Sequence, residues 1–161
     1  MGEKNCVILA FEKLFSFLNI IEVNLPEVLE KELYEKRFIS EKDVKDIINK
    51  LKNVLSQYNL SIDIYRLYND KEIISYFSKE EIEKEKKQQK ERAYEILNEN
   101  FGILLLDGDD NGHAYIFYKT KDLKPHEIII IDPRKEKTEK VEIEKIYKRI
   151  DYIIFLSKIL S

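Results

Sequence analysis

The chain of 161 residues holds one cysteine and two histidines, Cys6, His113 and His126, as its scarce reactive side chains. Cys6 stands near the start of an apolar stretch, residues 5–21, which its spacing predicts to be a buried helix with almost no polar face. Unpaired N–H groups and the helix dipole at such an end stabilise a negatively charged sulfur. Cys6 is therefore a candidate nucleophile, and the alternative is a small apolar side chain packed at the helix start.

His113 and Asp132 form the second candidate set, because His113 opens one predicted strand and Asp132 closes the next. A hairpin symmetric about residues 122 and 123 would pair them on one face of the sheet. A carboxylate beside an imidazole fixes its tautomer and stabilises its charged form, as in a nucleophile, base and orienter set. The alternative is a turn histidine and an Asp-Pro strand end, which is common turn chemistry.

The elements that must position these residues follow from hydrophobic spacing. Further helices are predicted from Pro26 to about residue 38 and from a capping box at Ser40. Strands are predicted at residues 60–67, 101–106, 114–118, 127–131 and 152–156, with a short helix before the last. Both faces of the later strands are apolar, so helices should cover both sides of the sheet.

We therefore expect one α+β domain over residues 1–161: a helical part at 1–58, then residues 60–161 as mainly antiparallel sheet with a charged helix at about 79–98. Residues 79–92 are nearly all charged, with both signs mixed. This pattern predicts a solvated helix face, and a contact surface for a protein partner is the alternative.

The composition bounds the class of protein. The formal net charge of -3 gives no field to recruit nucleic acid. No apolar run approaches the length that crosses a bilayer, and no signal-peptide pattern opens the chain. One cysteine among many lysines indicates a reducing compartment. We expect a protein of the cytoplasm, or one delivered into another cell, that binds neither nucleic acid nor membrane.

The segments Gly112-His113-Ala114-Tyr115-Ile116-Phe117 and Ile128-Ile129-Ile130-Ile131-Asp132-Pro133, with Asn5-Cys6 opening an apolar helix far upstream, resemble the papain-like cysteine hydrolase superfamily. The order and spacing suit its compact bacterial branches, among them double-glycine leader peptidases and papain-fold toxins that deamidate glutamine. The resemblance implies a papain-like α+β fold in which the Cys-bearing helix packs on the antiparallel sheet. It implies Cys6 as nucleophile, His113 as general base and acid, and Asp132 as the residue that orients His113.

Two departures from that family pattern stand near the cysteine. Family members commonly place a glutamine a few residues before the cysteine to bind the oxyanion, and only residues 1–5 precede Cys6, with no Gln among them. The Cys6 backbone N–H and the Asn5 side chain are the replacements we predict. The family often has Gly or Trp after the cysteine, where this chain has Val7. A catalytically inactive member of the fold therefore stays an alternative.

Metal chemistry has little support in the sequence. Residues 107–112 match the first positions of a calcium-binding EF-hand loop, but Tyr118 stands where a bidentate Glu is needed. We predict a polar hairpin tip there, with calcium binding as the weaker alternative. One Cys and two separated His match no usual zinc spacing, and His126 beside Pro125 is predicted to be an exposed loop residue.

The sequence thus predicts a cysteine-dependent amide hydrolase, a protease or isopeptidase, that acts on a protein or peptide through a thioester and needs no cofactor. A glutamine deamidase of the same fold is the second interpretation. A catalytically inactive papain-like module that binds protein partners is the third.

Overall fold

The structure is a computed structural model of the chain, and it describes residues 5–20, 23–37, 39–107 and 112–159. Six strands form one antiparallel sheet in the order β1-β6-β2-β3-β4-β5. Their bounds are β1 Leu60–Arg66, β2 Phe101–Leu106, β3 His113–Tyr118, β4 Glu127–Asp132, β5 Lys137–Glu142 and β6 Ile150–Lys158. The predicted α+β class with an antiparallel sheet is confirmed.

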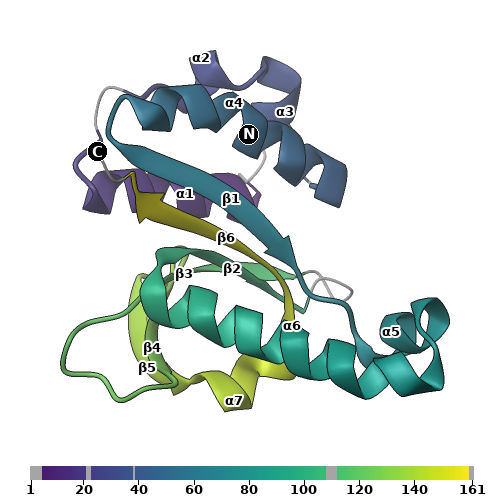
Figure 1. Cartoon of the computed structure of the whole chain (residues 1–161). Coiled ribbons are helices and arrows are strands. Elements are labelled where there is room, and N and C mark those ends of the chain that lie inside the picture. Colours follow the sequence, from purple (N-terminus) through teal and green to yellow (C-terminus); the bar gives the residue numbers. More distant parts are fainter. Residues whose placement is uncertain (1–4, 21–22, 38, 108–111, 160–161) are drawn as a thin grey trace.

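Helices cover both faces of this sheet (Figure 1). On one face lie α1 (Cys6–Phe17) and α4 (Glu41–Ser56), together with the short α2 (Leu25–Val28) and α3 (Lys31–Glu35). On the other lie α6 (Lys79–Glu99) and α7 (Ile143–Ile146), the latter followed by a single 3-10 turn, Tyr147–Arg149. Because each face packs against helices, the central strands β6, β2, β3 and β4 bury alternate residues into two different cores.

The start and end of α1 have local causes. Asn5 is the N-cap, and its side chain accepts a hydrogen bond from the Ile8 N–H at 2.8 Å. Asn19 follows the helix with a φ of 58°, and the Ile20 N–H bonds back to the Phe15 carbonyl. This left-handed residue stops the helix at Phe17, so the prediction of a helix reaching residue 21 is wrong.

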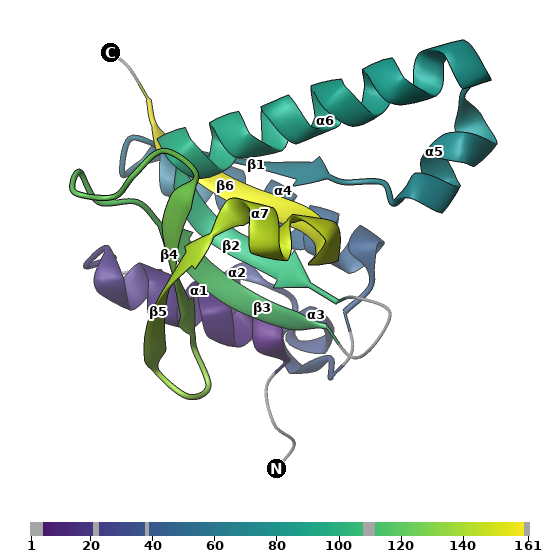
Figure 2. The same ribbon diagram turned by 90° about the horizontal axis from the view of Figure 1, so that it is seen from below.

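The charged helix is α6, and its two halves have different surroundings. Its buried residues, Ala93, Ile96 and Leu97, all lie in the carboxyl-terminal half, where the helix packs on the sheet. The amino-terminal half and α5 (Asp70–Tyr76) extend past the end of the strands as an arm (Figure 2). We call α5 and residues 79–92 of α6 the arm from here on.

Two elements differ from the sequence-based prediction. The strand β5 was not predicted, because its sequence, Lys-Thr-Glu-Lys-Val-Glu, is exposed and charged and carries no apolar alternation. The helix expected from Pro26 to about residue 38 is divided into α2 and α3. It breaks at Leu29, whose backbone is extended and whose side chain is only 1% exposed.

No helix within the described residues is both long enough and apolar enough to cross a membrane.

Candidate functional site

Cys6 is the first residue of α1, at the end of the helix that meets the start of β3. Its side chain is half-buried, and Sγ donates a hydrogen bond to the carbonyl of Gly112 at 3.4 Å. The helix runs along β3 in the same direction, so the cysteine lies beside the residue that precedes His113. Two parts of the chain that are 106 positions apart are therefore brought together at the backbone of Gly112.

Asn5 is 5% exposed and is held at both of its polar side-chain atoms. Oδ1 caps the helix through the Ile8 N–H, and Nδ2 donates to the Lys36 carbonyl at 2.6 Å. These bonds tie the start of α1 to the segment after α3 and fix the backbone of Cys6. The oxyanion role of Asn5 stays a prediction, and in this conformation its amide already has an acceptor.

His113 is exposed and lies on the sheet face opposite to α1. Ala114 and Ile116 pack in the core beneath α1, whereas Tyr115 and Phe117 pack in the core beneath α6. Side chains alternate along a strand, so His113 shares the face of Tyr115. The contact between their rings, with centroids 6.3 Å apart, agrees with this placement. The thiol and the imidazole thus belong to adjoining backbone segments but extend from opposite faces.

The register of β3 with β4 places Asp132 two residues from the position expected. Ile116 pairs with Ile131 and Tyr118 with Ile129, and one step further along this register Asp132 comes opposite Tyr115. The predicted direct pairing with His113 is therefore wrong. The hairpin is centred between residues 123 and 124 instead of 122 and 123. Its turn contains His126, with a φ of 72°, and a hydrogen bond from the Glu127 N–H to the Lys124 carbonyl.

Asp132 nevertheless shares a face with His113, because a shift of two residues preserves the alternation. Its Oδ1 accepts hydrogen bonds from the N–H groups of Arg134 at 2.9 Å and Lys135 at 3.4 Å. The carboxylate therefore shapes the turn into β5, which is the Asp-Pro turn chemistry that the sequence left open.

Asp107 is a second carboxylate near His113, and no sequence pattern identified it as a site residue. Asp107 follows β2 and accepts hydrogen bonds from the Arg149 guanidinium at 2.6 and 2.9 Å. These bonds, with a smaller contribution from the charge of His113, hold the pKa of Asp107 below its ordinary value. No sequence signal joins residues 107 and 149, because the pairing of β2 with β6 that brings them together is non-local.

Tyr152 on β6 lies in the apolar core against which Cys6 packs. It is 7% exposed, and burial raises its pKa strongly, with further contributions from Cys6 and Asp151. It pairs with Leu105 of β2, and both residues contribute to the core that Cys6 contacts. Tyr152 therefore forms part of the wall beside the thiol.

Burial of Tyr152 predicts a loss of stability at high pH. The unfolded phenol ionises near its ordinary pKa of 10.0, whereas the folded one keeps its proton. The unfolded state thus binds fewer protons, and the free energy of unfolding falls as the pH rises above about 10. We expect Tyr152→Phe to reduce this fall in urea unfolding between about pH 8 and about pH 11. If the free energy of unfolding fell equally steeply with pH in both proteins, burial of Tyr152 would not be the cause of the fall.

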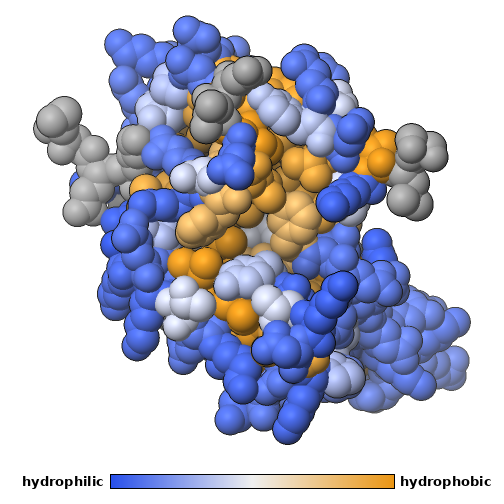
Figure 3. Space-filling view, turned by 90° about the vertical axis from the view of Figure 1, so that its left-hand side faces the viewer, coloured by the Kyte–Doolittle hydropathy of each residue, from blue (hydrophilic) through white to orange (hydrophobic). Residues whose placement is uncertain are grey.

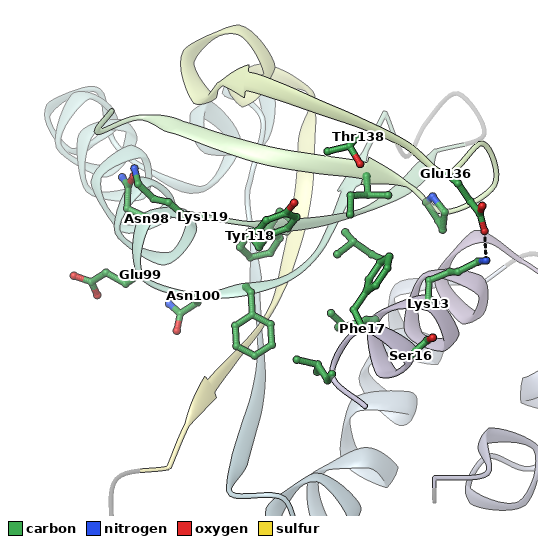
Figure 4. A pocket seen from close by; sticks show the side chains of 17 residues that line it. Lys13, Ser16, Phe17, Asn98, Glu99, Asn100, Tyr118, Lys119, Glu136 and Thr138 are labelled. Atoms are coloured by element: carbon green, nitrogen blue, oxygen red, sulfur yellow. Dashed lines mark hydrogen bonds and ion pairs between the residues drawn. The ribbon is translucent and has the colours of Figure 1, made fainter. Parts of the chain in front are cut away.

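Two cavities of the described part of the chain are large enough to be considered as a catalytic cleft. The larger, about 890 Å³, is at the carboxyl-terminal end of α1, between this helix and strands β2 to β5. Apolar side chains gather in this hollow (Figure 3), and Figure 4 shows the Lys13–Glu136 ion pair at one end and Asn98 with Lys119 at the other. None of Cys6, His113 and Asp132 lines it. Its position therefore does not support it as the catalytic cleft.

The smaller cavity, about 680 Å³, opens between the arm and the end of the sheet. Cys6, His113 and Asp132 do not line this cavity either. Its link to Cys6 is indirect: Leu105 and Tyr152 line it and belong to the core against which Cys6 packs. We call this cavity the arm pocket.

The metal and loop predictions have simple outcomes. Residues 108–111 of the possible calcium loop lie outside the described residues, and Asp107 is engaged by Arg149. In the part of the chain that the structure describes, no three His, Cys, Asp or Glu side chains are grouped to hold a metal ion. His126 is an exposed loop residue, as predicted, with its ring against that of Tyr94 at 5.0 Å.

No protein-family model matches the chain, and no curated protein is significantly similar to it.

Proposed function

We propose that the protein is a cysteine-dependent amide hydrolase of papain-like architecture, a protease or isopeptidase, with Cys6 as its nucleophile and His113 as its general base and acid. One observation carries the proposal: the thiol at the start of α1 is hydrogen-bonded, at 3.4 Å, to the residue before His113. A glutamine deamidase of the same fold would use the same two residues on a side-chain amide.

The proposed reaction is acyl transfer in two steps. The deprotonated sulfur attacks the amide carbonyl, and the imidazolium of His113 then protonates the leaving amine as the C–N bond breaks and a thioester remains. His113 next takes a proton from water, whose oxygen attacks the thioester and releases the acid and the thiol. The backbone N–H of Cys6, free of an intrahelical partner at the helix start, is the oxyanion donor of this proposal.

The proposal requires two side-chain movements, one of His113 and one of Cys6. His113 is the first residue of β3 and is exposed, so its ring turns from Tyr115 around the strand end towards Gly112. The thiol must also leave the Gly112 carbonyl. The conformation described here is thus a resting arrangement, and substrate that enters beside Tyr152 displaces the thiol from the carbonyl.

The test is the rate at which iodoacetamide alkylates Cys6, followed by intact mass. We expect Cys6 of the wild-type protein to react at least about tenfold faster than a free thiol near neutral pH, because activated cysteines carry more thiolate. His113→Gln should remove this advantage, and His126→Gln, at the other histidine, is the matched control that should keep it. Slow labelling in all three proteins would overturn the proposal.

Asp107 and Asp132 are the two candidates for the carboxylate that positions His113, and substitutions of them distinguish the two. The resemblance assigns Asp132, whereas the charge of His113 acts on Asp107 in the structure. We expect Asp107→Asn to slow the alkylation of Cys6 by about tenfold, because the imidazole loses a charge partner that positions it. Rates that fall only with Asp132→Asn would restore Asp132 as the sole positioning carboxylate.

The second candidate function is a papain-like module that binds a protein partner without catalysis. The observation that favours it is the placement of His113 and Asp132 on the face opposite to α1. The arm, which extends beyond the sheet, is then the contact surface (Figure 2). A biological effect that persists in Cys6→Ala protein and is lost on charge reversal along residues 79–92 would select this function.

A further inference from the structure

We propose that the arm pocket binds an acidic segment of a peptide and leads it towards Cys6. The binding step stands on the pocket itself, and only the delivery to Cys6 rests on the proposed function. Tyr152 links the two places, because it lines the pocket and is buried in the core against which Cys6 packs.

The lining of the arm pocket is more basic than the chain as a whole. The chain carries a net charge of -3, but five basic side chains face the pocket against three acidic ones. The basic set is Arg66, Lys71, Lys86, Lys90 and Lys148, and the acidic set is Glu41, Glu72 and Asp151. Lys90 is paired with Glu144 at 2.9 Å, so the positive charge that can attract an acidic ligand comes mainly from Lys71 and Lys148.

The carboxylates in the wall are largely used within the protein. The Arg66 guanidinium bonds to Glu41 and, at 3.1 Å, to Glu72, so one arginine compensates two acids. Lys71 and Lys148 are exposed and form no ion pair with another described residue. These two lysines are therefore free to pair with carboxylates of a ligand.

One wall of the arm pocket is fixed by the Gln89 side chain, which bonds to both backbone polar groups of one residue. The amide of Gln89 on α6 accepts from the Tyr68 N–H at 2.8 Å and donates to the Tyr68 carbonyl at 2.9 Å. These two bonds fix the arm to the segment after β1. The Tyr68 ring, 43% exposed and stacked under Arg66 at 5.1 Å, gives an apolar surface beside the charges.

A peptide fits this lining better than a nucleic acid does. A volume of about 680 Å³ holds a few side chains, and the carboxylates of Glu41, Glu72 and Asp151 repel closely spaced phosphates. The pocket thus matches a chain with separated negative charges.

The test uses full-length Cys6→Ala protein and a fluorescein-labelled peptide in which glutamate alternates with alanine. Anisotropy at low salt should show binding at least about tenfold tighter than that of the peptide with glutamine in place of glutamate, and added salt should weaken it. The double variant Lys71→Glu with Lys148→Glu should lose this preference. Lys79→Glu with Lys87→Glu, which makes the same charge change on α6 outside the pocket, is the matched control and should keep it.

Three outcomes would overturn the inference: equal affinity for the glutamate and glutamine peptides, an equal loss in the control double variant, or tighter binding of a single-stranded oligonucleotide. The proposed function is tested separately by the same glutamate peptide with a chloroacetyl group at either end, added to the protein that retains Cys6. Binding without labelling of Cys6 would keep the acidic-peptide site and reject the hydrolase.

Discussion

Gly102→Ala is expected to destabilise the protein by about 3 kcal/mol or more, because a side chain at this position has no room. A Cβ built on Gly102 would lie 2.0 Å from the carbonyl oxygen of Ile154 and 3.0 Å from the Cα of Phe155. Both atoms belong to the backbone of β6, so the clash cannot be relieved by rotation of a side chain. Two central strands of the sheet would have to move apart.

The measurement for Gly102→Ala is the midpoint of chemical unfolding, with far-ultraviolet circular dichroism as the probe. Lys137→Gln on β5, an exposed position in the same sheet, is the control and should change the free energy of unfolding by about 0.5 kcal/mol or less. If Gly102→Ala unfolded at the same denaturant concentration as the parent, the close pairing of β2 with β6 would be incorrect.

Cys6→Ala is expected to abolish amide hydrolysis, with a loss on the order of 10,000-fold or more, because removing the nucleophile removes the covalent path. The fold should survive the change. The side chain is half-buried, it contributes one weak S–H bond, and alanine suits the first turn of a helix. The melting temperature should therefore change by only a few degrees, by roughly the amount that 1 kcal/mol produces.

Turnover is best followed with a panel of amides: a peptide bond, an isopeptide bond and a glutamine side chain, with amine or ammonia release as the readout. The bond that the wild-type protein cleaves separates protease, isopeptidase and deamidase. Cys6→Ser is a second variant that keeps a hydroxyl in place of the thiol, and it should be inactive as well. Turnover by either variant that equals the wild-type rate would reject Cys6 as nucleophile.

Much of the fold could be predicted from the sequence because its signals are local. The capping box at Ser40 and the apolar stripe after it specify α4, and β-branched runs specify strands β2, β3, β4 and β6. The short strand β5 was missed, because an exposed edge strand that is covered with charge has no hydrophobic period to detect. The stop of α1 at Asn19 shows that one left-handed residue can outweigh an apolar pattern that continues.

Some features of the candidate site could likewise be predicted from the sequence, and others could not. The sequence alone determined that Cys6 begins a buried helix and that His113 shares one face of its strand with Tyr115, since helix caps and strand alternation are properties of neighbouring residues. Only the tertiary structure decided which face that is, because β3 and β4 are apolar on both sides and either side could have received α1. It also decided the two-residue register shift, set by the β3–β4 turn, and the approach of Asp107 to Arg149 through the pairing of β2 with β6. Contacts between distant segments depend on how whole faces pack, and no local pattern encodes that choice.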